Sequence, residues 1–439
     1  MHSAEARAAF AATALAALLS AAPARTQAAP EPQDRPIARA LSWIDEGLRG
    51  SDASALIASI WRDLQVGGRL SRFVQALEQR ALAPAAEGVR RRALALLHQC
   101  ASHGRWEDFP GPERLKIARC FEKQILDPSL PVPLRGEVLV WMAGLAGTPE
   151  RLSWVLEGSA RLERHAAIRR SSKDDPERDL LPYVAGYLAE LGEDASAAIG
   201  ALASQLEGPV GPRTDERELR RAVLRALERI GPHAEPAEAE ALFVRCAELA
   251  RDEAEPAEEA LMVLIALAGR LPLERERLAR AHASLLPSGG GAFASSRIRA
   301  YGRIALRGTP RVASRAFAAL WSLRLREPSV EDAALGAMGE IACSNSPIFG
   351  EREARQPLFD LLSAFEALDE KNARLSPLSI AALRMLTLLA TRIDEIEDGD
   401  LREELEQRAM QLAARLIEKP YRGMRDAARL WVRRSKGSD

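Results

Sequence analysis

The densest group of metal-binding residue types in the chain is the stretch HQCASH, which holds His98, Cys100 and His103. Imidazole and thiolate groups are the usual ligands of structural zinc, so this stretch raises the question of a metal site. The two histidines are five positions apart, which places them on different faces of a helix, and no fourth ligand follows. We therefore predict a helix end with ordinary polar residues here and no metal site.

Other arrangements that could support catalysis or cofactor binding are incomplete in this sequence. The glycines of SGGGAFASS, residues 288–296, are followed by no lysine and preceded by no strand, so they do not form a phosphate-binding loop. Nucleophilic catalysis needs a serine or cysteine beside a histidine base, and none of the six histidines lies in such a motif. A Cys-x-x-Cys-His haem attachment motif is absent. We predict that the chain is not an enzyme and needs no cofactor.

The residues that remain as candidates are those suited to binding another protein. Four arginines lie on the polar sides of candidate helices and could form a basic ladder for an acidic segment of a partner. Two aromatic residues in a polar loop could anchor a partner. The alternatives are a salt-bridged, solvated face for the arginines and aromatic rings folded over a neighbouring helix pair. The predicted partner-binding residues are Arg221, Arg225, Arg299, Arg303, Trp106 and Phe109.

A regular helix must position the first two of these arginines. In DERELRRAVLRALERIGPHAEP, residues 215–236, apolar residues recur at spacings of three and four and form one stripe. Asp215 is predicted to cap the first turn, with Glu218 as its capping-box partner. Gly231 is predicted to take the left-handed conformation after the helix end, and Pro232 prevents continuation.

A second helix with the same features, an apolar stripe between an aspartate cap and a Gly-Pro end, is predicted just upstream in DASAAIGALASQLEGPVGP. Its predicted cap is Asp194. Two such stripes joined by a short turn predict an antiparallel hairpin, which needs neighbours to bury both stripes. The same spacing recurs in residues 260–268, 330–341 and 378–389, and more loosely around 90–100, 136–147 and 425–434. The interval of about 35 to 47 residues is the period of two-helix solenoid repeats.

Residues 192–236 resemble a HEAT repeat, a pair of antiparallel helices that stacks into a superhelix. Asp215 and Arg221 match an aspartate and arginine pair found in many repeats of that family, and the resemblance implies that they bond along the solenoid. In another unit, Asp332 occupies the position equivalent to Arg221. In a third unit, Ala382 lies two places after the corresponding position. Those units are therefore assigned from the periodicity of their apolar residues. The predicted fold is an all-α, right-handed α-solenoid of antiparallel helix pairs, a HEAT-like or armadillo-like superhelix. In such solenoids the second helices line the concave, partner-binding surface.

The length and amino-acid composition are those of a large helical protein. The 439 residues are 47% hydrophobic and 28% charged but only 5% aromatic, and the helix formers alanine, leucine, glutamate and arginine are abundant. The formal net charge is -1, without the basic excess expected of a nucleic-acid-binding protein. The four cysteines are scattered. Cys100 and Cys120 could bridge two helices in an oxidising compartment, or all four could be small buried hydrophobes.

The N-terminus has the organisation of a secretory signal peptide, with an apolar run, AAFAATALAALLSAA, before small-residue cleavage positions. The alternative is an alanine-rich tail or a misplaced start codon. We predict a signal peptide at 1–28, a disordered linker at 29–36, a solenoid at 37–435 and a tail at 436–439. The longest later apolar run, LMVLIALAG from Leu261, is too short to span a membrane. The mature chain is therefore expected to be periplasmic or secreted, without a membrane span.

These features together predict an exported, non-enzymatic scaffold that binds a protein partner, with an acidic segment, through its concave face or its inter-helix loops. The alternative is an enzyme or an enzyme-accessory subunit on the same architecture. Some HEAT-like proteins are bilin lyases and others are alkylpurine DNA glycosylases, but no residues here match their functional residues. No nucleic-acid partner is expected.

Overall fold

The computed structural model describes the chain in segments. They are residues 35–47, 50–66, 68–83, 86–103, 111–145, 149–170, 178–207, 214–251, 257–288, 291, 293–343, 348–366, 377–416 and 422–436. All regular structure within these segments is helical, without strands. The chain divides into two compact units: unit 1 comprises Met1–Leu130 with Gly144–Thr148, and unit 2 comprises Pro131–Ala143 with Pro149–Asp439. Each unit is described by itself.

Unit 1 is a small stack of helix pairs. Its helices are α2 (Arg35–Glu46), α3 (Gly50–Leu64), α4 (Arg69–Leu82), α5 (Glu87–Ser102) and α6 (Gly111–Leu126). α5 packs on α2, α3 and α4, and α6 packs on α4 and α5. The apolar stripe predicted around residues 90–100 lies in α5, where Leu94 and Leu97 are fully buried against a core that includes Phe73 and Phe121.

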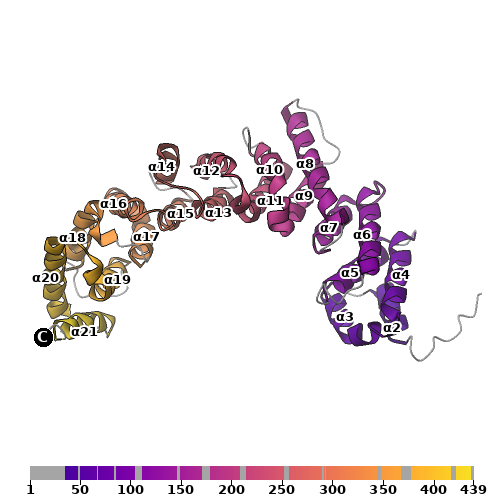
Figure 1. The fold of residues 1–439 in the computed structure, drawn as a ribbon, viewed down its shortest axis with the longest axis horizontal. Helices are drawn as coiled ribbons and strands as arrows, with labels where there is room; N and C mark the ends of the chain where they lie inside the picture. Colours follow the sequence, from indigo (N-terminus) through magenta and orange to yellow (C-terminus); the bar gives the residue numbers. More distant parts are fainter. Residues whose placement is uncertain are drawn as a thin grey trace, which may run out of the picture. The chain divides into compact units, whose positions relative to one another are not determined.

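Unit 2 is a longer succession of helices, drawn in Figure 1. They are α7 (Val132–Ala143), α8 (Pro149–Arg170), α9 (Leu181–Leu191), α10 (Ile199–Ser204), α11 (Thr214–Ile230), α12 (Pro236–Arg251), α13 (Ala257–Ala268), α14 (Glu276–Ala283), α15 (Ala294–Ala305), α16 (Pro310–Arg326), α17 (Glu331–Cys343), α18 (Arg352–Glu366), α19 (Pro377–Arg392), α20 (Gly399–Leu416) and α21 (Arg422–Lys436). Short 3₁₀ turns join several of them, including η3 (Gly192–Ala198), η4 (Gly231–His233) and η6 (Ile348–Gly350).

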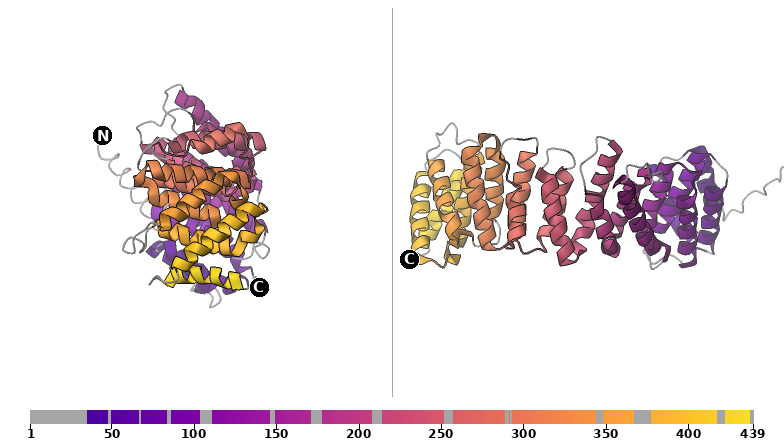
Figure 2. Two further views of the ribbon diagram at one scale, coloured as in Figure 1. Left: turned by 90° about the vertical axis from the view of Figure 1, so that its left-hand side faces the viewer. Right: turned by 90° about the horizontal axis from the view of Figure 1, so that it is seen from above.

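These helices form two layers. The odd-numbered helices α7 to α21 pack each on the next without a break and form what we call the odd layer. The even-numbered helices α8 to α20 form the even layer, and each pairs with the odd-numbered helix that follows it in the chain. Figure 2 shows the pairs stacked side by side. This arrangement confirms the predicted all-α solenoid of helix pairs, while its right-handedness stays a prediction.

The predicted apolar stripes form the core between the layers. In α11, Val223, Ala226, Leu227 and Ile230 are fully buried, as the spacing of three and four requires. The stripes at 260–268 and 378–389 lie in α13 and α19, and the stripe at 330–341 lies in α17 and at the end of the 3₁₀ turn η5 (Pro328–Val330) before it. Their apolar positions are buried, except that Ile265 is partly exposed. The looser stripes around 136–147 and 425–434 lie in α7 and α21. The repeat units therefore lie where the periodicity places them.

The helix ends were predicted less accurately than the apolar stripes. α11 begins at Thr214, so Asp215 lies inside the first turn and not before it. Asp194 lies within the 3₁₀ turn η3 and caps no α-helix, because the α-helical part, α10, begins only at Ile199. Gly231 does not take a left-handed conformation but opens the 3₁₀ turn η4. A Cβ at Gly231 would lie 3.2 Å from Leu267 Cδ2, so the packed leucine leaves little room for a side chain here.

Candidate functional site

The four predicted arginines lie on two helices of the odd layer. Arg221 and Arg225 belong to α11, and Arg299 and Arg303 belong to α15. In both helices they lie on the solvent side, opposite the buried stripe, because their spacing of four positions keeps each pair on one helical face. In Figure 1 the odd layer follows the inner side of unit 2 and the even layer its outer side. The solvent side of the odd layer is therefore the candidate surface.

The α11 arginines reach across to the next odd helix. Arg221 Nε lies 3.8 Å from Glu259 Oε1 in α13, and Arg225 Nη2 lies 3.5 Å from the same oxygen. The resemblance to HEAT repeats implies an arginine that bonds along the solenoid, and Arg221 does so with Glu259. Nothing is described of the Asp215 side chain, so its predicted bond to Arg221 stays a prediction.

The α15 arginines differ from each other. Arg303 Nε lies 3.7 Å from Glu340 Oε2 in α17, which repeats the pattern of α11 two helix pairs further along. Arg299, whose side chain is exposed, makes no ion pair with any residue in the described segments. Arg299 is therefore the predicted arginine that is most available to an incoming carboxylate.

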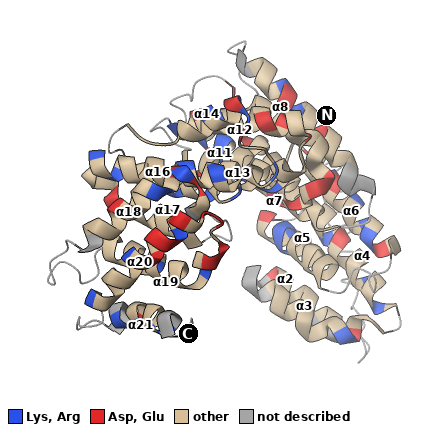
Figure 3. Cartoon of the chain, turned by 60° about the vertical axis from the view of Figure 1, so that its left-hand side comes forward, with Lys and Arg blue, Asp and Glu red and all other residues tan. Residues whose placement is uncertain are grey.

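The structure does not bring the four arginines together into one ladder. α13 lies between α11 and α15, and its solvent side carries Glu258, Glu259 and the partly exposed Met262. Figure 3 shows basic and acidic segments interspersed over unit 2. The surface is thus two arginine pairs with two carboxylates and one exposed thioether between them. We call Arg221, Arg225, Met262, Arg299 and Arg303 the odd-layer surface.

Ion pairs on this surface are weak enough to exchange. The side chains of Arg225 and Arg303 are 69% and 52% exposed, and exposed pairs contribute about 0–1 kcal/mol because water screens them. A carboxylate of a partner can therefore replace Glu259 or Glu340 at little cost in free energy. Both readings of the arginines, as a salt-bridged face and as a binding surface, are compatible with this geometry.

The remaining predicted binding residues, Trp106 and Phe109, lie outside the described residues, and so do the predicted signal peptide, 1–28, and most of the linker after it.

Sequence reasoning missed a set of buried and partly buried polar side chains that bond backbone carbonyls of neighbouring units. Arg245 of α12 donates from Nε and Nη2 to the carbonyl of Leu206, at 3.1 and 2.6 Å. Trp431 of α21 donates from Nε1 to the carbonyl of Leu386 in α19, at 2.9 Å. These bonds tie successive units together. Their acceptors are backbone atoms, so no pairing of residue types in the sequence could have revealed them.

The histidine and cysteine side chains are mostly enclosed. Burial lowers the pKa of His98 to about 4 and raises the pKa of the Cys120 and Cys246 thiols to about 12. Cys100, Cys120 and Cys246 are buried and Cys343 is exposed, and all four are free thiols in the structure. Among the described residues, no group of three or more histidine, cysteine or acidic side chains could hold a metal ion. Within the same segments, no helix has the length and hydropathy to cross a bilayer.

Comparisons with known proteins add a likeness but no family. No protein-family model matches the chain. No curated protein matches it by sequence either. An engineered protein of known structure shares 15% identity at a TM-score of 0.45, over 91% of this chain and 99% of that one. The karyopherin Kap121p bound to the SUMO protease Ulp1p shares 12% identity at a TM-score of 0.48, over 94% of this chain. Kap121p bound to Ste12p shares 13% identity, also at 0.48, over 93% of this chain.

This chain spans less than half of the length of the Kap121p chains, 46% and 45% in these two cases. All three TM-scores are below 0.5, so the fold assignment rests on the helices and their packing described above.

Proposed function

We propose that the protein is an exported, non-enzymatic scaffold that binds a protein partner through the odd-layer surface. The partner contributes an acidic segment that crosses α11, α13 and α15. The observation that carries this proposal is the exposed Arg299, which has no ion-pair partner among the described residues and lies on the same helical face as Arg303.

The architecture supports the proposal. A solenoid exposes a long succession of equivalent helix faces, and such surfaces are suited to extended partners. Arg299 and Arg303 can bind one carboxylate of the partner between them. Arg221 and Arg225 share Glu259 and can exchange it for another carboxylate of the partner. Met262, 41% exposed on α13, offers an apolar contact between the two arginine pairs.

The proposal is tested by capture of the partner in the native host. The chain carries a C-terminal affinity tag, its own N-terminus is left intact, and complexes are isolated after mild crosslinking. Wild-type protein is compared with Arg299→Glu. The matched control is Arg277→Glu, at an exposed arginine of α14 in the even layer.

We expect one abundant partner with the wild type, at least about tenfold less of it with Arg299→Glu, because like charges oppose each other, and full recovery with Arg277→Glu. Equal recovery of that partner by all three chains would show that it does not bind at the odd-layer surface. Absence of any partner above background would contradict the scaffold function itself.

A further inference from the structure

A pocket of about 280 Å³ opens in the even layer, away from the odd-layer surface. Its lining residues come from the α13–α14 connection and from α14, α15 and α16. α14 is only eight residues long and packs on α12 and α15 but not closely on α16. The even layer is therefore incomplete at this point, and α15 of the odd layer forms the floor of the opening.

The floor is a stacked pair of rings. The centroids of His282 and Tyr301 are 4.0 Å apart, and the ring planes are within 10° of parallel. His282 Nε2 lies 3.0 Å from the backbone carbonyl of Tyr301, and because a carbonyl only accepts, Nε2–H is the donor. Burial lowers the pKa of His282 to about 4, so the ring is neutral near pH 7. Each of the two residues is only 5% exposed, so the floor offers a small, largely apolar surface without charge.

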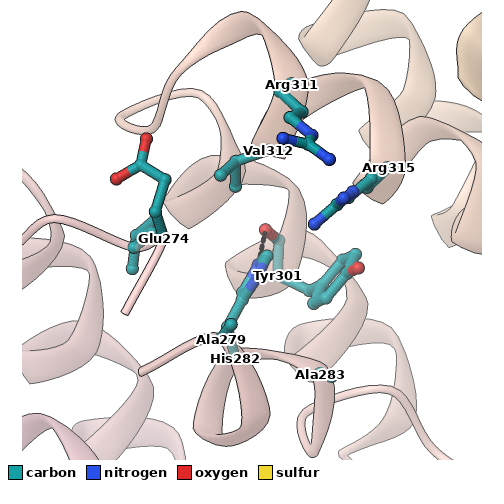
Figure 4. Close-up of a pocket in the computed structure, with 9 residues that line it drawn as sticks. Glu274, Ala279, His282, Ala283, Tyr301, Arg311, Val312 and Arg315 are labelled. Atoms are coloured by element: carbon teal, nitrogen blue, oxygen red, sulfur yellow. Dashed lines mark hydrogen bonds between the residues drawn. The ribbon is translucent and has the colours of Figure 1, made fainter. Parts of the chain in front are cut away.

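The charge comes from two arginines one helical turn apart on α16. Figure 4 shows the guanidinium groups of Arg311 and Arg315 directed toward the middle of the pocket, while Glu274 lies on the other side of Val312. Arg315 Nε lies 3.5 Å from Glu353 Oε1, and Arg311 makes no ion pair with a residue of the described segments. A backbone hydrogen bond lowers the pKa of Glu353 and the charge of Arg311 adds to this effect, but the Arg311 guanidinium makes no direct ion pair there and can bind an anion with Arg315 beside it.

The start of α16 adds to the same preference. Thr309 precedes the helix without a side-chain hydrogen bond to it, and Arg311 and Val312 of the first turn line the pocket. The first amide N–H groups of a helix have no partner within it, and together with the helix dipole they favour a negative charge.

Three charged groups that line the pocket, together with Glu353 beside Arg315, limit the charge of the ligand. Arg311 and Arg315 are offset by Glu274 and Glu353, so the local sum is close to zero and does not favour a dianion such as phosphate. We propose that this pocket binds a single carboxylate, held by Arg311 and Arg315, with an apolar or aromatic body resting on the His282–Tyr301 floor. The carboxylate comes from a free small organic acid or from the C-terminus of a peptide. This site stands independently of the odd-layer surface.

The proposal is tested by titrating the purified protein with benzoate, and with benzamide as the neutral molecule of the same shape. An N-acetylated dipeptide ending in phenylalanine is used with a free and with an amidated C-terminus. Calorimetry or ligand-observed NMR measures each affinity in wild type, Arg311→Gln and the control Arg277→Gln. Circular dichroism and thermal unfolding show whether each variant is folded.

We expect saturable binding of benzoate and no binding of benzamide. The affinity for benzoate should fall at least about tenfold in Arg311→Gln, because one charge-assisted hydrogen bond is removed. It should not change in Arg277→Gln. Binding of the free-acid dipeptide as well would assign the site to peptide C-termini, and binding of benzoate alone would assign it to small acids. The proposal is overturned if neither acid binds, if benzamide binds as tightly as benzoate, or if folded Arg311→Gln keeps wild-type affinity.

Discussion

At the scale of single residues, the stack is held by polar side chains that bond distant backbone groups as well as by its apolar core. Gln205 is fully buried and donates from Nε2 to the carbonyl of Leu162, 43 positions earlier, at 2.6 Å. Arg297 donates to the carbonyl of Arg251 across 46 positions. The separations correspond to about one repeat, so these bonds set the register between neighbouring pairs.

The enclosed His282 predicts a pH dependence of stability. Its pKa is about 4 in the folded chain, below the usual 6.5, because burial disfavours the charged ring. The unfolded chain therefore binds more protons between these pH values, and stability is full above pH 6.5 and falls as the pH drops toward 4. A shift of this size corresponds to about 3 kcal/mol. The groups around the ring are Glu274, Tyr301, Arg311 and Arg315.

The measurement is urea unfolding of wild type and His282→Phe, followed by circular dichroism, at several pH values from 8 to 4. The difference at pH 8 reports packing and the lost hydrogen bond to the carbonyl of Tyr301, because the ring is then neutral in both states. We expect His282→Phe to lose less stability than wild type between pH 6.5 and 4. If the free energy of unfolding falls equally in both proteins over that interval, folding does not lower the pKa of His282.

At the scale of helices, the sequence predicts which segments stack but not how they end. The stripes of α11, α13, α17 and α19 are long and regular, and burial follows them. The predicted ends were wrong where tertiary packing overrode local rules: Gly231 opens a 3₁₀ turn that packs against Leu267, and Asp194 lies within η3 and not before an α-helix. The arginines of the candidate site could be predicted by type and helix face, whereas their glutamate partners on the next helix could not.

Two glycines in the middle of neighbouring helices should respond oppositely to alanine. A Cβ at Gly336 in α17 would meet no atom within 4 Å, so Gly336→Ala gains helix propensity and should stabilise the chain by about 1 kcal/mol. A Cβ at Gly302 in α15 would lie 2.9 Å from the Cβ of Ala337, so Gly302→Ala forces α15 and α17 apart and should destabilise it.

Thermal or urea unfolding of the two single variants beside the wild type checks this pair. The same substitution is made in each, so a shared effect on the unfolded chain cancels in the comparison. Equal shifts of the two midpoints would show that α15 and α17 do not approach as closely as described.

At the scale of the whole molecule, the chain is a succession of helix pairs in two compact units, and its proposed role depends on where it is delivered. Export is predicted from residues 1–28, with small residues at Ala22, Ala24, Thr26 and Ala28. Intact-mass measurement of the protein purified from its native host should show a chain that begins at residue 25 or 29, recovered from the periplasm or the medium. A chain that keeps residues 1–28 and stays with the cytoplasmic fraction would contradict export.

We infer that the arginines of the odd-layer surface bind a partner and do not serve only to pair with glutamates of the next helix. This is decided by the affinity of the captured partner for wild type, Arg303→Glu and the charge-swapped double variant Arg303→Glu/Glu340→Arg. The swap restores an ion pair between α15 and α17, so a purely structural arginine predicts that the double variant regains wild-type affinity. Our account predicts that both variants stay folded and that both bind the partner at least about tenfold more weakly than wild type. Wild-type affinity in the double variant would contradict it.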